Sequence, residues 1–147
     1  MITQNRWQHI LSVARKAKNL ALKLRPKDEQ FAQDMFLLGL LHDIGYEFCN
    51  DVCNHGAIGG KILERSKYKY WQEVANHGNE TIDQMSDELF ILNYADMTTG
   101  SNGEDFSFDE RLKDIADRYG ADSSAYKKCV IEVEKLKSDI RCYNFYD

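Results

Sequence analysis

Apolar residues recur at steps of three and four along most of the chain, the spacing expected where helices bury one face. The clearest case is the segment Arg6–Leu24, whose apolar positions are Trp7, Ile10, Leu11, Ala14, Ala17, Leu20, Ala21 and Leu24. Pro26 ends this predicted helix because proline lacks the backbone N–H that a helix interior needs. Asp28 is placed to cap a second helix, which the pattern carries through Leu41.

Five more segments show helical spacing, and polar or glycine-containing stretches separate them. The predicted helices are His55–Arg65, Tyr70–His77, Asp87–Thr98, Phe108–Tyr119 and Ser123–Arg141. Loops are predicted over Asp43–Asn54 and around Gly100, Asn102 and Gly103. Strands are not expected, because the chain has few runs of β-branched residues and only one proline to interrupt helices. The sequence therefore predicts an all-α fold of six to seven helices, in a single domain over residues 1–147.

The composition is that of an ordinary globular chain, with 147 residues of which 43% are hydrophobic and 29% charged. Nineteen Lys and Arg against 24 Asp and Glu give a formal net charge of −5. This balance disfavours general nucleic-acid binding, which needs a surplus of cations to neutralise phosphates. No apolar run approaches the roughly 20 residues that span a bilayer, and the N-terminus lacks the apolar region of a signal peptide. We therefore expect a cytoplasmic protein that binds neither nucleic acid nor membranes, and its oligomeric state stays open.

The charges are unevenly distributed, with seven basic and no acidic residues between Met1 and Lys27. A basic first helix is suited to steering a polyphosphate toward a site. A solvated helix face is the other interpretation of the same pattern.

The positions of two aspartates, one next to a histidine and one in an apolar helix, suit the binding of a metal ion. His42 is followed at once by Asp43 where an apolar helix gives way to a loop. Neighbouring helical residues diverge by about 100°, so both side chains reach one ion only where the helix ends. Asp96 lies near the end of another apolar helix, where an unpaired buried carboxylate is costly unless a cation compensates. Each of these residues, taken alone, is also explained by ordinary packing, capping or a salt bridge.

In chain order, these residues and the other histidines resemble the HD-domain superfamily of metal-dependent phosphohydrolases. The resemblance covers roughly residues 6–119 and leaves a C-terminal helix at about 123–141 outside this core. The matching segments are Arg6-Trp7-Gln8-His9, Gly39-Leu40-Leu41-His42-Asp43-Ile44-Gly45, His55-Gly56-Ala57, Asn76-His77-Gly78 and Tyr94-Ala95-Asp96.

The resemblance implies a site for two divalent ions. Its first ion would be held by His9, His42, Asp43 and Asp96. His55 and His77 resemble the extra ligands of dinuclear branches, with Asp43 bridging the two ions, and His42 and Asp43 are the expected catalytic residues. Mixed imidazole and carboxylate ligands suit iron, manganese, cobalt, nickel or zinc.

The resemblance also implies an activity. The chain looks most like the branch that includes the symmetrical dinucleoside polyphosphate hydrolases of bacteria. We expect hydrolysis of a phosphoester or phosphoanhydride bond in a nucleotide or nucleoside polyphosphate, by a metal-bound hydroxide. Two alternatives remain: a mononuclear nucleoside mono- or triphosphate hydrolase, and a non-catalytic nucleotide-binding regulatory module.

Three basic residues are candidate substrate contacts. Arg6 lies one turn before His9, and Lys61 and Arg65 lie four apart after His55. Solvent exposure is the alternative for each. Many relatives carry a lysine directly after the His-Asp-Ile-Gly turn, where it can meet a phosphate, but this chain has Tyr46.

The cysteines offer a competing metal site. Cys49, Cys53 and His55 lie within seven residues, so a structural zinc ion is an alternative use of this loop. The chain has only four cysteines, too few for a disulfide scaffold, which favours ordinary reduced thiols.

Overall fold

The computed structural model describes residues 2–49 and 54–145, and the regular structure within them is helical. The α-helices are α1 (Gln4–Leu24), α2 (Glu29–Leu41), α3 (His55–Arg65), α4 (Trp71–Asn76), α5 (Asp87–Met97), α6 (Phe108–Tyr119) and α7 (Ser124–Ser138). Two 3₁₀ segments, η1 (Ile44–Glu47) and η2 (Ile140–Phe145), complete the described part of the chain. The predicted all-α fold is therefore confirmed.

Polar side chains set the starts of most of these helices. Each accepts a hydrogen bond from a backbone N–H of the first turn, which otherwise has no partner. The residues that do so are Thr3, Asp28, Asn54, Ser86, Ser107 and Ser123. At α6 the bond is reciprocal, because the Glu110 side chain also accepts from the backbone N–H of Ser107.

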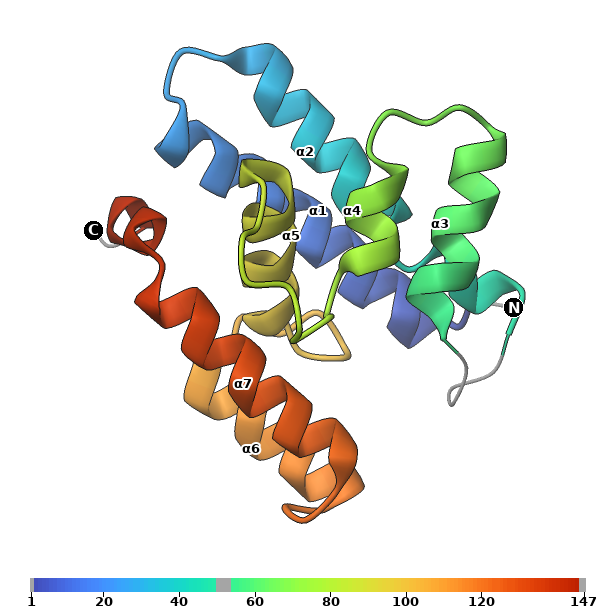
Figure 1. The fold of residues 1–147 in the computed structure, drawn as a ribbon, viewed down its shortest axis with the longest axis vertical. Coiled ribbons are helices and arrows are strands. Elements are labelled where there is room, and N and C mark those ends of the chain that lie inside the picture. Colours follow the sequence, from blue (N-terminus) through green and yellow to red (C-terminus); the bar gives the residue numbers. More distant parts are fainter. Residues whose placement is uncertain (1, 50–53, 146–147) are drawn as a thin grey trace.

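Helices α1 and α2 form an antiparallel pair against which α5 packs (Figure 1). The pair is very close at Gly39, where an added Cβ would lie 2.5 Å from the Cα of Ala14. The core between these three helices is apolar, and its fully buried side chains include Ile10, Met35, Phe90 and Leu92. Burial of this surface is the main driving force that holds the three helices together.

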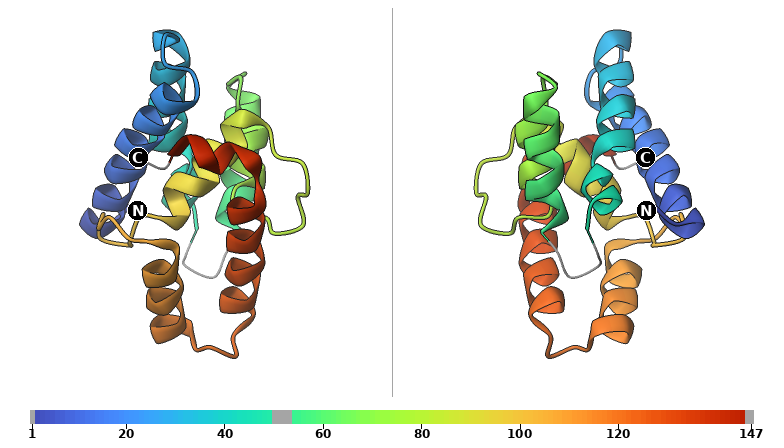
Figure 2. Two further views of the ribbon diagram at one scale, coloured as in Figure 1. Left: turned by 90° about the vertical axis from the view of Figure 1, so that its left-hand side faces the viewer. Right: turned by 90° about the vertical axis from the view of Figure 1, so that its right-hand side faces the viewer.

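The remaining helices form two pairs at the edges of this core. Helices α3 and α4 pack on each other on one side. Helices α6 and α7 extend together as a hairpin away from the other helices (Figure 2). Lys135 of α7 ties the hairpin to the segment between α4 and α5, because its Nζ lies 2.7 Å from Asp83 Oδ1 and 3.3 Å from the carbonyl oxygen of Ile82.

Most helix boundaries lie within two residues of the sequence prediction, and two differences are larger. The predicted loop after Asp43 contains η1, a short 3₁₀ turn. The last α-helix ends at Ser138 instead of Arg141, because Asp139 adopts an extended conformation. Its carboxylate accepts hydrogen bonds from the backbone N–H and the Nε–H of Arg141, a local alternative to continuing the helix. Among the described residues, no helix combines the length and apolar character needed to cross a bilayer.

Candidate metal centre

The structure brings together four histidines and two aspartates from five helices and the turn that follows α2. His9 lies in the second turn of α1, and Asp96 in the last turn of α5. The other four residues stand at helix ends, namely His42 and Asp43 after α2, His55 at the start of α3 and His77 after α4. The ends of α2, α4 and α5 carry partial negative charge, which favours a cation between them.

One half of the cluster is formed by His9, His42 and Asp96 together with one oxygen of Asp43. Nε2 of His9 lies 2.9 Å from Asp96 Oδ1 and 3.7 Å from Asp43 Oδ2. Nε2 of His42 lies 3.7 Å from Asp96 Oδ1 and 3.3 Å from Asp43 Oδ2. The ring nitrogens and carboxylate oxygens therefore converge on one small volume, which is the arrangement that a single ion requires.

The other half is formed by His55, His77 and the second oxygen of Asp43. The two Nε2 atoms lie 3.1 Å apart, and Asp43 Oδ1 lies 3.4 Å from His55 Nε2 and 3.5 Å from His77 Nε2. Asp43 thus presents Oδ2 to one pair of histidines and Oδ1 to the other. A carboxylate has lone pairs on both oxygens, so this orientation allows it to bind two cations at once.

Backbone carbonyls fix the rings of three histidines. The Nδ1 atoms of His9, His42 and His77 lie 2.9, 2.6 and 2.6 Å from the carbonyl oxygens of Gly100, Gly39 and Val74. A carbonyl only accepts, so each Nδ1 carries the proton, and in the neutral ring Nε2 keeps its lone pair. All three Nε2 atoms face the cluster, and such bonds are typical of histidines that ligate metals.

The charges inside the cluster are strongly coupled. Burial by itself would lower the pKa of His42, but the adjacent Asp43 and Asp96 outweigh it and hold the His42 pKa well above its ordinary value. Burial would raise the pKa of both aspartates, but His42 outweighs it and holds the pKa of each well below its usual range. The two carboxylates therefore remain ionised, and the cluster presents two negative charges to a cation.

His42 carries the observation that best fits a metal ion. Its side chain is fully buried, and within the described residues its Nε2 has no hydrogen-bond partner of acceptable geometry. A buried polar nitrogen without a partner is costly, and a ligated cation would remove that cost. Two groups, His9-His42-Asp96 and His42-Asp43-His77, each place three ligand atoms within 4.8 Å of one another. The residues present therefore fit divalent metal ions.

Two residues that support the cluster were not predicted from the sequence. Asn93, 1% exposed on α5, accepts a hydrogen bond from the backbone N–H of Gly78 at 3.0 Å and so fixes the turn that carries His77. The signal for Asn93 in the sequence is that it is a lone amide side chain within an apolar helix. Gly45 packs directly on His55, because an added Cβ would overlap the His55 carbonyl oxygen. A side chain at residue 45 would therefore displace His55.

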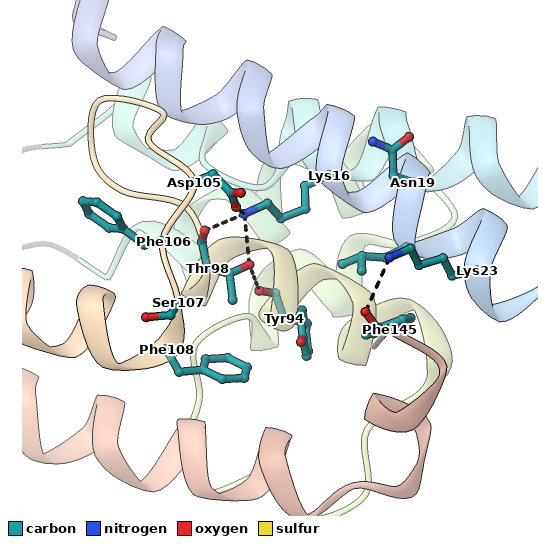
Figure 3. A pocket seen from close by; sticks show the side chains of 11 residues that line it. Lys16, Asn19, Lys23, Tyr94, Thr98, Asp105, Phe106, Ser107, Phe108 and Phe145 are labelled. Carbon is teal, nitrogen blue, oxygen red and sulfur yellow. Dashed lines mark hydrogen bonds and ion pairs between the residues drawn. The ribbon is translucent and has the colours of Figure 1, made fainter. Parts of the chain in front are cut away.

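The loop between α5 and α6 is anchored from α1. Lys16 Nζ hydrogen-bonds to the side chain of Thr98 at 3.2 Å and to that of Asp105 at 2.6 Å (Figure 3). This lysine thereby fixes the loop whose Gly100 carbonyl orients His9. Lys16 also lines a separate cavity of about 440 Å³ with an aromatic wall that includes Tyr94. None of the six residues of the histidine–aspartate cluster lines this cavity.

Of the three predicted substrate contacts, Arg6 contacts the cluster. Its Nη1 lies 3.5 Å from Asp43 Oδ2. Lys61 and Arg65 are exposed on α3, and within the described residues neither forms an ion pair with the cluster. Their role as phosphate contacts stays a prediction.

The cysteine loop differs from the sequence expectation. Cys49 is disulfide-bonded instead of a reduced thiol. Cys53 lies outside the described residues, and the imidazole of His55 is directed to His77 and Asp43.

The fold and the cluster together define an all-α protein with a histidine–aspartate centre that could hold metal ions. A family model described as "HD domain" matches residues 6–122. The chain therefore belongs to the HD-domain family, whose members are typically metal-dependent phosphohydrolases. A search of curated proteins gives no match, and a search of solved structures gives none either.

Proposed function

We propose that the protein is a dinuclear metal-dependent phosphohydrolase that cleaves a phosphoester or phosphoanhydride bond of a nucleotide or nucleoside polyphosphate. The observation that carries this proposal is the orientation of Asp43. Its two oxygens face two different histidine pairs, one with Asp96 beside it and one without. A mononuclear site would need only the histidine pair that has Asp96 beside it.

In this proposal His9, His42, Asp43 and Asp96 hold the first ion. The second ion is held by His55, His77 and the other oxygen of Asp43. Imidazole and carboxylate ligands favour Fe, Mn, Co, Ni or Zn over magnesium, which prefers an all-oxygen shell. Two aspartates supply two negative charges against the four positive charges of two divalent ions, so the occupied centre would attract an anion such as phosphate.

Bound divalent ions would supply a Lewis acid that lowers the pKa of water and neutralises charge on the phosphoryl oxygens. The chain's own residues orient and bury the site. Hydrogen bonds from three Nδ1 atoms to carbonyls hold the rings, and Asp43 and Asp96, whose pKa values are held well below their usual range, supply negative charge at neutral pH. In the reaction water gives up a proton and its oxygen joins phosphorus, while the leaving oxygen departs with the electron pair of the broken P–O bond and takes up a proton.

A nucleotide substrate is the finer part of the proposal. It is supported by the resemblance to the branch with symmetrical dinucleoside polyphosphate hydrolases and by the basic character of residues 1–27. Arg6, next to Asp43 and partly exposed, is the best-placed cation for a substrate phosphate. Lys61 and Arg65 are proposed to contact more distant phosphates.

The test combines metal analysis with a phosphate-release screen. The purified protein is loaded separately with Mn²⁺, Fe²⁺, Co²⁺, Ni²⁺ or Zn²⁺ and assayed on mononucleotides, nucleoside triphosphates and dinucleoside polyphosphates. We expect close to two ions per chain and turnover of at least one nucleotide class. One ion with turnover would favour the mononuclear hydrolase, and nucleotide binding without turnover would favour a regulatory module.

A further inference from the structure

Tyr46, in the 3₁₀ turn directly after Asp43, packs against a proposed ligand of the second ion. Its ring lies on the imidazole of His55, with centroids 4.1 Å apart and an angle of 19° between the planes. This stacking restricts rotation of the His55 ring, whose Nε2 faces Asp43 Oδ1 at 3.4 Å. Tyr46 is therefore in a position to fix the direction of the His55 lone pair.

The same ring also contacts the guanidinium of Arg6. The Cζ atom of Arg6 lies 3.8 Å from the centroid of the Tyr46 ring, which is a close cation–π distance. The Arg6 side chain is 29% exposed, and its Nη1 reaches Asp43 Oδ2 only at 3.5 Å. A contact of that length is a weak hydrogen bond, whereas the distance to the ring is well within the range of a cation–π contact.

The two supports of Arg6 would respond differently to bound metal. Cations next to Asp43 would compete with Arg6 for that carboxylate and repel the guanidinium. The contact with the neutral Tyr46 ring does not depend on that carboxylate. In the occupied centre, the Tyr46 ring would therefore be the contact that keeps the Arg6 guanidinium close to the cluster.

We propose that Tyr46 is a positioning residue whose ring holds Arg6 toward a substrate phosphate and His55 toward the second ion. This inference rests on the proposed function. The ligand class for Arg6 is a phosphate group, which a planar guanidinium binds through two parallel N–H donors. Lysine cannot replace arginine in this role, because it lacks the planar group that stacks on the ring.

The test uses the Mn²⁺-loaded full chain and measures inorganic phosphate binding by calorimetry together with Mn²⁺ per chain. Tyr46→Leu removes the ring, Tyr46→Phe keeps it, and Arg6→Gln and Arg6→Lys remove the guanidinium. Arg15→Gln is the matched control, because Arg15 is an exposed arginine of the same helix.

We expect Tyr46→Leu, Arg6→Gln and Arg6→Lys each to weaken phosphate binding by about tenfold or more, the loss expected for one charge-assisted contact. Tyr46→Phe and Arg15→Gln should stay within about twofold of the unsubstituted protein. Tyr46→Leu should also lower Mn²⁺ content through His55, whereas Arg6→Gln should not. Where a substrate is found, Tyr46→Leu should raise KM for it.

Three results would overturn the inference. These are unchanged phosphate binding and Mn²⁺ content in a folded Tyr46→Leu, a loss in Tyr46→Phe as large as in Tyr46→Leu, and phosphate binding by Arg6→Lys equal to that of the unsubstituted protein. Arg6→Lys and Tyr46→Phe decide the matter if Tyr46→Leu fails to fold by circular dichroism. Lack of nucleotide turnover would contradict the proposed function alone, because phosphate and Mn²⁺ binding still test Tyr46.

Discussion

Oδ1 of Asp43 lies 3.5 Å from Nε2 of His77, on the side of the carboxylate directed away from His42. His77 therefore contacts only one of the two oxygens of Asp43, whereas Asp43 takes part in both halves of the cluster. Removal of these two side chains should have different consequences for metal content, which provides the most direct test of two ions.

Asp43→Ala should abolish binding of both ions and essentially all turnover, because each half of the cluster loses a carboxylate oxygen. His77→Ala should leave the first ion in place, since His9, His42 and Asp96 are untouched. Its turnover should still fall by orders of magnitude, because one of two cooperating ions is missing. Metal per chain is measured by elemental analysis, and circular dichroism checks folding.

Asp122→Ala is the control for the loss of an aspartate, because Asp122 is exposed between α6 and α7. It should keep the metal content and rate of the unsubstituted protein. Retention of both ions in Asp43→Ala would contradict a bridging role for Asp43.

Metal binding should release protons in a way that reports on His42. Burial lowers the pKa of His42, but Asp43 and Asp96 outweigh it and raise the pKa of His42 well above its ordinary value. The raised pKa favours a protonated His42 in the metal-free protein, and a metal ion must displace that proton. We expect release of about one proton per chain at pH 7, falling toward zero at alkaline pH. Calorimetry in buffers of different ionisation enthalpy measures this number.

The raised pKa of His42 also determines how the stability of the fold changes with pH. A raised pKa in the folded state stabilises the metal-free protein below about pH 6.5, the value of free histidine, and this contribution is lost as pH rises through the folded pKa. The metal-loaded protein should behave oppositely and lose ions and stability as pH falls. Metal uptake at pH 7 without proton release would contradict this protonation state.

Gly45→Ala should disrupt the second half of the cluster more than the first. The added methyl group would overlap the carbonyl oxygen of His55 and come 2.9 Å from its Cα, so α3 must shift. We expect a lower melting temperature and loss of about one ion per chain, because His55 moves away from Asp43. Differential scanning calorimetry and elemental analysis measure the two effects.

Glu47→Ala, in the same 3₁₀ turn, is the control for a substitution at this place. Glu47 is exposed, and its carboxylate accepts a hydrogen bond from the backbone N–H of Ile2 at 3.1 Å. A Gly45→Ala protein with two ions and an unchanged melting temperature would show that this close packing is dispensable.

Glu132→Gln should stabilise the protein at alkaline pH. Glu132 is buried on α7, its Oε1 has no hydrogen-bond partner within the described residues, and burial raises its pKa to about 8. The folded state therefore keeps a proton that the unfolded state releases near pH 4.5, and stability falls as pH rises between these values. Glutamine stays neutral and avoids this loss.

The stability difference between Glu132→Gln and the unsubstituted protein should be small at pH 5 and reach about a few kcal/mol at pH 8 and above. Urea unfolding of the metal-free proteins across this range gives the difference directly. Glu134→Gln, at an exposed position of the same helix, should show no such trend. A difference independent of pH would mean that Glu132 is ionised in the fold throughout.

The helices could be predicted from the sequence because their signals are local. The spacing of apolar residues and the capping side chains act within about four residues along the chain. The predicted range Phe108–Tyr119 matches α6, and the predicted cap Asp28 does accept from Phe31. The end of α7 was missed because a side chain competes with the helix there, through the bonds from Arg141 to Asp139.

The residue types of the candidate centre were also determined by the sequence, since four histidines and two aspartates occur in the order of the HD-domain family. Their geometry depends on contacts between distant segments. Gly100 orients His9 from 91 positions away, and Arg6 meets Asp43 from 37 positions away. The packing of α1 and α5 on one side of Asp43, and of α3 and α4 on the other, decides which oxygen of Asp43 faces which histidine. No local pattern carries that information, because a side chain's partners across the core are fixed when the helices pack together.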